Sequence, residues 1–420
     1  MMCSLVLAAV TAAPNVVFLS VDTLRADRLG CYGYPRPTSP NLDRFARDAL
    51  VFDDCVCETP LTAPSFGSML TSLYPRMTGL TRNGLRMPGD APTVAESFQA
   101  AGYQTFCVQS NWTLKGHLSG LDRGFDAYDE GFHRKRWGFI KPERYADEVT
   151  RVALEQLARL APDRRFFCWI HYSDPHAPYR YHRDFSPSGE PGEFSGRRDK
   201  VRARYDSEVA FTDHHIGRLL EAIPRENTFI LFVADHGESL YEHDYLGHGR
   251  RIYQTCIRIP LMVAGPGIAP GRTSIEARGI DIGPTLLALG GLTPLPNMLG
   301  MNLLGPDAPL ERRRVVETYG GAVPRLPGAK ALMADRPPQR QGVLSGGWKL
   351  ILDEAGRAEL FHVCEDSMEE TDRAAAEPER VSALRGLIEA WNALHPRGAT
   401  KAVDLTRDDR QALESLGYLK

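Results

Sequence analysis

Four short apolar runs, each without alternating polar residues, constrain the fold of this chain more than any other feature. They are rich in β-branched and aromatic side chains and span residues 15–20, 104–109, 166–172 and 228–234. Runs of this kind are typical of strands that are buried on both faces of a parallel sheet. Segments with helical periodicity, at residues 145–160 and 201–222, lie between them. We therefore predict an α/β fold with a mostly parallel central sheet and helices on both faces.

Two helix starts can be read directly. Ser39 followed by Pro40 predicts an N-cap with proline at the first helical position. Thr93, with Glu96 three residues later, predicts a capping box.

The last part of the chain has a different pattern. Strand-like segments at residues 342–344, 348–352 and 359–363 are separated by glycine-containing turns, and a helical pattern covers residues 377–395. A Pro- and Gly-rich stretch precedes them. We therefore predict a main domain over residues 14–324 and a small antiparallel C-terminal subdomain with a helix over residues 342–420.

Charge and hydropathy exclude some partners. The 420 residues carry a formal net charge of -3, from 50 basic and 53 acidic side chains, so nucleic acid is not an expected partner. No segment reaches the roughly 18 apolar residues of a transmembrane helix. Residues 1–13 hold an apolar run that ends in small residues but lacks a basic start. They predict either a truncated signal peptide, hence a periplasmic or extracellular protein, or a leader without structure, which leaves the cytoplasm open.

Two of the predicted strands run into acidic residues. Asp22 follows the first strand, and Asp235 with His236 follows the fourth. Because ligand sites of open α/β sheets gather at the carboxyl ends of strands, these side chains are expected to meet. Either aspartate alone would be a turn residue or helix cap. Together with the imidazole they form a candidate site for a hard cation such as Mg, Mn, Ca or Zn.

Thr62 precedes a helix whose predicted first turn includes Pro64 and Ser65. The unpaired N–H groups at a helix start favour an anion beside them, so the Thr62 hydroxyl could attack a bound phosphate or sulfate. The alternative is that Thr62 is a simple N-cap.

Two histidines lie in loops that follow strands. His176 stands in an Asp-Pro-His-Ala-Pro segment, and His248 in a glycine-flanked loop beside Arg250. Either could bind an oxyanion, donate a proton to a leaving group, or ligate a metal. Either could also be a solvated loop residue.

These residues belong to a longer ordered set of segments, at residues 15–27, 30–33, 62–75, 102–105, 174–178, 235–238, 258–261, 281–287, 348–350, 359–370 and 416–419. In this order the segments resemble the sulfatase family of the alkaline phosphatase superfamily. The resemblance implies an alkaline-phosphatase-like sandwich and a metal-dependent hydrolase of sulfate or phosphate esters. It also implies one divalent cation held by Asp22, Asp235 and His236, with Thr62 as nucleophile reaching that cation and His176 contacting the substrate.

Several positions depart from the family pattern. The family nucleophile is a Cys or Ser that is converted to formylglycine, with an Arg four positions on, where this chain has Thr62 and Phe66. A second acid after the first metal ligand is replaced by Thr23. A family Lys is replaced at Ser110 or Asn111.

Other side chains are candidates to rebuild the lost anion contacts. Asn111 could donate its amide to a substrate oxygen, and Lys115 or Arg250 could restore a positive charge. A second Lys of the family pattern is absent near His248, so His248 and Arg250 are the nearest candidates to take over its role.

The substrate expected from this pattern is a small-molecule, glycan-derived or lipid-derived anionic ester. Threonine favours a phosphodiester or phosphonate monoester over a sulfate ester, because it lacks the second hydroxyl by which a formylglycine hydrate expels sulfate. Two alternatives stay open: a phosphoryl-group transferase and a catalytically inactive sulfatase-like binding protein. The sequence leaves metal identity and oligomeric state undecided.

Overall fold

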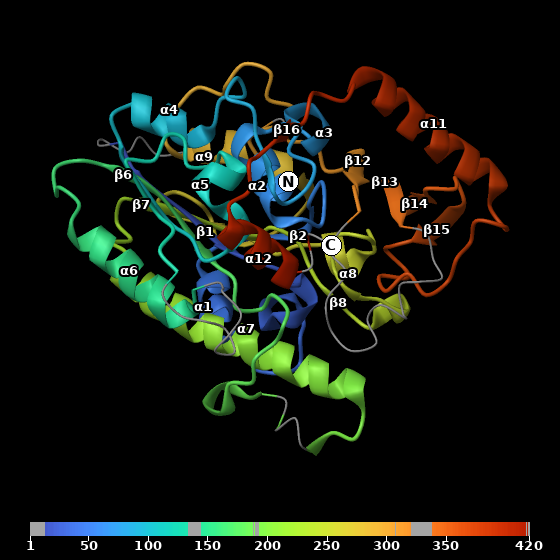
Figure 1. Cartoon of the computed structure of the whole chain (residues 1–420), viewed down its shortest axis with the longest axis horizontal. Coiled ribbons are helices and arrows are strands. Elements are labelled where there is room, and N and C mark those ends of the chain that lie inside the picture. The colour runs from blue at the N-terminus through green and yellow to red at the C-terminus, as the bar shows by residue number, and fades with distance from the viewer. Residues whose placement is uncertain are drawn as a thin grey trace.

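The computed structural model describes residues 13–132, 144–187, 189, 193–306, 308–320, 338–416 and 418. Its centre is an eight-stranded sheet with the order β11-β2-β10-β7-β1-β6-β4-β5. Among the described pairings only β10 runs antiparallel to its neighbours, β2 and β7. The prediction of a mostly parallel sheet is therefore confirmed (Figure 1).

The four predicted strands lie in the middle and on one side of this sheet. They are β1 (Asn15–Val21), β4 (Gln104–Val108), β6 (Phe166–Tyr172) and β7 (Thr228–Ala234). Nearly all of their residues are buried, which explains why they lack polar alternation. The other strands of the sheet are β2 (Leu50–Val56), β5 (Ala127–Asp129), β10 (Leu261–Ala264) and β11 (Gly271–Arg278).

Helices cover both faces of the sheet (Figure 1). One face carries α1 (Pro40–Arg47), α6 (Ala146–Ala158) and α7 (Arg197–Ala222). The other carries α2 (Thr62–Thr71), α4 (Val94–Ala100) and α9 (Ile282–Leu289).

The two predicted helix starts have different outcomes. The capping box of Thr93 and Glu96 is present at the start of α4. Ser39 occupies the N-cap position of α1, but its side chain makes no capping bond, because its hydroxyl donates to the Asp43 carboxylate instead.

A second, antiparallel sheet is formed by β12 (Arg314–Glu317), β13 (Gln339–Ser345), β14 (Trp348–Asp353) and β15 (Ala358–His362). Helix α11 (Pro378–Leu394) packs on it through Leu384 and Ile388, as the sequence predicted. The division at residues 324 and 342 stays a prediction, and most of the stretch between them lies outside the described residues.

The final helix, α12 (Arg407–Ser415), was not predicted. The short strands are β3 (Leu85–Arg86), β8 (Ser239–Leu240), β9 (Leu246–Gly247) and β16 (Lys401–Ala402). The short α-helices are α3 (Pro75–Thr78), α5 (Gly116–Ser119) and α8 (Gln254–Ile257). The 3-10 turns are η1 (Ala26–Arg28), η2 (Gly30–Tyr32), η3 (Trp112–Leu114), η4 (Arg183–Phe185), η6 (Glu242–Asp244) and η7 (Gly279–Asp281).

None of the helices in the described part of the chain is long and apolar enough to cross a membrane. The predicted leader, apart from Ala13, lies outside the described residues.

Candidate metal and esterase site

The candidate site lies at the carboxyl ends of four neighbouring strands. In sheet order, β7 leads into Asp235 and His236, β1 into Asp22, β6 into the loop of His176, and β4 into the turn that holds Asn111. This edge is where ligand sites of open α/β sheets form. The fold therefore brings together residues that are far apart in the sequence.

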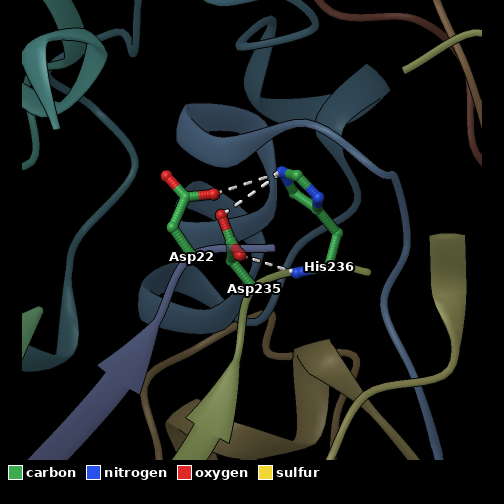
Figure 2. A group of neighbouring side chains, drawn as sticks. All are labelled: Asp22, Asp235 and His236. Atoms are coloured by element: carbon green, nitrogen blue, oxygen red, sulfur yellow. Dashed lines mark hydrogen bonds and ion pairs between the residues drawn. The ribbon is translucent and has the colours of Figure 1, made fainter. Parts of the chain in front are cut away.

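Asp22, Asp235 and His236 converge on one point (Figure 2). His236 Nε2 lies 3.4 Å from Asp235 Oδ2 and 3.8 Å from Asp22 Oδ1. All three side chains are fully buried, and one ligand atom from each falls within 4.8 Å of the others.

Backbone groups hold the cluster in place. Asp235 Oδ1 accepts hydrogen bonds from the backbone N–H of Thr23 at 3.1 Å and of His236 at 2.8 Å. Thr23 makes its bond from a left-handed conformation, φ +54°, which is uncommon for a β-branched residue. His236 Nδ1 lies 2.9 Å from the carbonyl oxygen of Gly237, so this nitrogen is the donor and Nε2 faces the carboxylates with its lone pair.

The electrostatics of the cluster suit a cation. Burial raises the pKa of Asp235 to about 7, because an ionised carboxylate loses its hydration there. Burial, followed by the neighbouring His248, lowers the pKa of His236 well below its ordinary value, so its imidazole stays neutral. Asp235 Oδ2 accepts no hydrogen bond from any described residue. Two buried carboxylates with a neutral imidazole lone pair aimed between them fit a divalent cation.

A second group of potential ligands makes contacts of its own. It comprises Asp174, His182 and Glu208. Glu208 Oε2 lies 2.7 Å from His182 Nε2, and Glu208 Oε1 accepts the backbone N–H of Arg180. Asp174 Oδ1 accepts the N–H of Ala146. Each of the three side chains therefore has at least one hydrogen-bond or ion-pair contact within the fold.

Thr62 is the first residue of α2, and the N-cap position belongs to Leu61. The alternative that Thr62 is a simple N-cap is therefore wrong. Its Oγ1 lies 3.4 Å from His236 Nε2, at the edge of the carboxylate cluster and at the positive end of the helix. The hydroxyl is thus directed at the candidate metal position.

Phe66, one turn after Thr62, belongs to the hydrophobic core. Its ring lies against Trp169 and His171, with ring centroids 4.8 Å away in both cases, and against Phe18 at 6.2 Å. Burial lowers the pKa of His171 to about 3, so this neighbour is neutral. The position at which the resemblance implies an Arg therefore carries no positive charge here.

His176 and His248 contact each other beside the cluster of Asp22, Asp235 and His236. Their ring centroids lie 5.1 Å apart, and the His248 ring lies 4.4 Å from that of His236. His176 Nδ1 lies 2.7 Å from the carbonyl oxygen of Ala177. Both rings are buried, so the interpretation of either as a solvated loop histidine is wrong.

The other three predicted residues differ in where their contacts lie, and among the contacts that the described residues make, only Asn111 contacts a candidate metal ligand. The Asn111 amide donates to Asp22 Oδ2 at 2.5 Å, while its Oδ1 accepts from Thr113. The Lys115 ammonium lies over the Trp112 ring, 4.0 Å from its centroid. Arg250 makes two hydrogen bonds through its backbone. Its N–H donates to the Tyr245 hydroxyl, and its carbonyl oxygen accepts from the N–H of Gln339. Substrate roles for these three residues stay predictions.

Sequence reasoning missed three side chains at this site. His171 Nε2 lies 3.9 Å from Asp22 Oδ2, Glu238 Oε1 lies 3.4 Å from His248 Nδ1, and the Tyr418 hydroxyl reaches both His176 and His248. Each stands in a segment that carried the family resemblance or in a predicted strand. Nothing in the local pattern assigned them to the site.

Comparison with known families decides the wider identity. The family model described as Sulfatase matches residues 14–292. The chain belongs to the sulfatase family. It is therefore a hydrolase of ester bonds within the alkaline phosphatase superfamily, as the ordered segments indicated. The match covers every predicted metal ligand and Thr62.

Individual relatives are similar to this sulfatase-family chain in sequence, and solved structures are similar to it in fold. It is 28% identical to the ulvan-active sulfatase of Formosa agariphila over 362 residues, which are 75% of this chain and 70% of the relative. A solved structure described as a complex with the substrate D-glucosamine-2-N,6-O-disulfate is 20% identical, with a TM-score of 0.74, and covers 91% of this chain and 98% of that one. The phosphonate monoester hydrolase of Agrobacterium radiobacter is 19% identical, with a TM-score of 0.71, and covers 94% and 99%.

Proposed function

We propose that this sulfatase-family hydrolase cleaves phosphodiesters or phosphonate monoesters, with Thr62 as the nucleophile and one divalent cation held by Asp22, Asp235 and His236. The observation that carries the proposal is the position of the Thr62 hydroxyl. It is buried, begins a helix without capping it, and lies 3.4 Å from His236 Nε2. A divalent cation in this cluster would lower the pKa of a neighbouring hydroxyl and neutralise charge on the ester oxygens.

The reaction proceeds in two displacements. Thr62 Oγ1 forms a bond to phosphorus while the bond to the leaving alcohol breaks, and the proton of the Thr62 hydroxyl passes through solvent or a neighbouring histidine to that alcohol. Water then attacks the phosphorus of the threonine ester, the bond between phosphorus and Thr62 Oγ1 breaks, Thr62 regains a proton, and the product anion is released. His176 and His248 lie next to each other, and His248 lies next to His236. From there we expect them to contact the non-bridging oxygens or to donate a proton to the leaving group.

The threonine itself favours phosphorus over sulfur. A sulfated formylglycine hydrate keeps a second hydroxyl on the same carbon, which can collapse to the aldehyde and expel sulfate by C–O cleavage. Thr62 has one hydroxyl, so a sulfated Thr62 could be cleared only by attack of water at sulfur. A phosphothreonine offers water a more accessible route at phosphorus.

Charge favours a monoanion over a dianion. Phe66 stands in a packed aromatic cluster where the resemblance implies an Arg. The amide of Asn111 is engaged with Asp22, where the resemblance implies a Lys nearby. Fewer cations stabilise less negative charge, so phosphomonoester dianions should be poor substrates.

Sulfate-ester hydrolysis is the second candidate. The names of the relatives favour it, since they include an ulvan-active sulfatase and a protein bound to a disulfated glucosamine. Those names also support a substrate that is a glycan-derived anionic ester, in which a sugar hydroxyl provides the alcohol part. Export from the cytoplasm remains part of the proposal, on the pattern of residues 1–13.

The test is a hydrolysis screen of nitrophenyl esters under several divalent metals: a phosphate diester, a phenylphosphonate monoester, a phosphate monoester and a sulfate. We expect the diester or the phosphonate to give the highest kcat/KM. Thr62→Ala should lose this turnover, whereas Thr62→Ser should keep part of it. Aryl-sulfate hydrolysis that disappears in Thr62→Ala, without phosphoester turnover, would overturn the preference.

Two further outcomes separate the remaining alternatives. A phosphoryl-group transferase would give more transferred product than free phosphate when an acceptor alcohol is added. An inactive binding protein would bind the metal without hydrolysing any ester in the screen.

A further inference from the structure

The segment that contains α12 is anchored directly beside the candidate site. Trp112 Nε1 donates to Asp409 Oδ1 at 3.1 Å, and His117 Nε2 lies 3.0 Å from Asp409 Oδ2. Ala412 packs against Trp112 and Leu118. Because Trp112 follows Asn111 in the chain, the helix is fixed to the same turn that contacts Asp22.

Tyr418 follows this helix, and its hydroxyl lies between the two candidate substrate histidines. The distance is 3.0 Å to His248 Nε2 and 3.4 Å to His176 Nε2. The backbone N–H of Tyr418 donates to the carbonyl of Leu413 at 2.8 Å, which ties the residue to the end of α12. The side chain is only half-buried.

Hydrogen-bond chemistry gives this contact a direction. The carbonyl of Ala177 can only accept, so His176 Nδ1 carries the proton and, in the neutral ring, Nε2 accepts the Tyr418 O–H. The phenol oxygen is then available to accept from His248 Nε2. On its other side, His248 Nδ1 lies 3.4 Å from Glu238 Oε1, and because a carboxylate only accepts, His248 carries a proton on both ring nitrogens when both contacts form. One hydroxyl thus sets the mutual orientation of both rings.

We propose that Tyr418 is a positioning residue of the esterase site, which aligns His176 and His248 on the substrate ester and is delivered by the docking of α12. The proposal rests on the proposed function, since that function gives the two histidines their role. A displacement of about 1 Å in a reacting or charge-stabilising group can cost on the order of 100-fold in rate. The hydroxyl of Tyr418 should therefore matter far more to turnover than to folding.

Tyr418→Phe removes the hydroxyl and leaves the ring. We expect kcat/KM on the best ester of the screen to fall by roughly 10- to 100-fold. Tyr103→Phe is the matched control, because Tyr103 lies at the amino end of β4, opposite to the strand ends that hold the site, and its hydroxyl donates to the Gly290 carbonyl, so its loss should leave kcat/KM unchanged. Asp409→Asn weakens the anchoring of α12 and should lower kcat/KM in the same direction as Tyr418→Phe.

Melting temperature separates positioning from stability, because Tyr418→Phe should melt within a few degrees of the unmodified protein. An unchanged or raised kcat/KM in Tyr418→Phe would overturn the proposal, and a raised kcat/KM would show that Tyr418 obstructs the site. A loss of activity that follows the loss of melting temperature equally in both Tyr variants would also overturn it.

A binding measurement keeps the inference separate from the proposed function. Inorganic phosphate is titrated into the metal-loaded protein by calorimetry. Tyr418→Phe should weaken phosphate binding about tenfold or more while the affinity for the metal alone stays the same. If no ester of the screen is hydrolysed, the proposed function fails. If phosphate binding is equal in Tyr418→Phe and the unmodified protein, the inference about Tyr418 fails.

Discussion

The side-chain amide of Asn111 donates a hydrogen bond of 2.5 Å to Asp22 Oδ2, so a residue predicted to bind substrate is attached to a candidate metal ligand. Asn111 is itself held by two bonds from Thr113 to its Oδ1. The amide therefore fixes the rotation of the Asp22 carboxylate. Partners of this kind orient metal ligands and tune their affinity.

Asn111→Ala should accordingly weaken metal binding more than it weakens the fold. Loss of such a partner typically costs about 10- to 100-fold in metal affinity or activity. Titration calorimetry with Mg, Mn, Ca and Zn measures the affinity. An unchanged metal Kd, together with a raised KM, would instead return Asn111 to the substrate-binding role predicted from the sequence.

Asp235→Ala removes one of the three candidate ligands, so a divalent metal should no longer stabilise the protein. In the unmodified protein a metal at 100 times its Kd adds about 2.7 kcal/mol to the free energy of unfolding. Thermal melting with and without metal, after chelator treatment, measures this difference. Glu208→Gln, in the second acidic group, is the control and should keep the full response. If the stabilisation by metal disappears in Glu208→Gln and survives in Asp235→Ala, the metal binds at the second acidic group instead.

His176→Ala should lose most activity and keep a near-normal melting temperature. Its ring contacts His248 and the Tyr418 hydroxyl at the site and is not part of the hydrophobic core. Removal of a general acid or of an oxyanion contact costs on the order of 100-fold or more in kcat. The control is His214→Ala, on the exposed side of α7, which should leave kcat unchanged. Unfolding or failed expression of His176→Ala would show a structural histidine.

Four central-sheet strands could be predicted from the sequence and the other four could not, and strand β2 shows a physical reason. Strand β7 is buried throughout and is therefore uniformly apolar. Strand β2 carries Asp53 and Asp54, which break its apolar pattern. Their partners, Arg272 at 2.6 Å and Arg314 at 2.6 Å, come from distant segments, so nothing local shows that the charges are neutralised.

The candidate site likewise contains residues that could be predicted from the sequence and one that could not. Asp22, Asp235 and His236 follow strands directly, so the tendency of ligand sites to form at the carboxyl edge of a sheet is enough to predict that they meet. Tyr418 reaches His176 across 242 residues and His248 across 170. That contact depends on the docking of α12 through Trp112 and Asp409, a tertiary contact that no periodicity reports.

Glu58 provides a prediction for stability as a function of pH. Its side chain is buried, Oε1 accepts the N–H of Ile280 at 3.1 Å, and Oε2 has no hydrogen-bond partner among the described residues. Burial raises the pKa of Glu58 from 4.5 to about 8. Between these two values the folded protein holds one proton more than the unfolded chain. The contribution of Glu58 to the free energy of unfolding therefore falls as the pH rises from about 4.5 through about 8.

Glu58→Gln keeps the shape of the side chain and removes the titration. We expect it to change the free energy of unfolding little near pH 5 and to raise it at pH 9, relative to the unmodified protein, by on the order of 2–4 kcal/mol. Urea unfolding at both pH values measures the two differences. Glu155→Gln, on the solvent side of α6, is the matched control and should give no pH-dependent difference. If Glu58→Gln destabilises the protein equally at both pH values, the Glu58 carboxyl is ionised in the folded protein and its charge is stabilising.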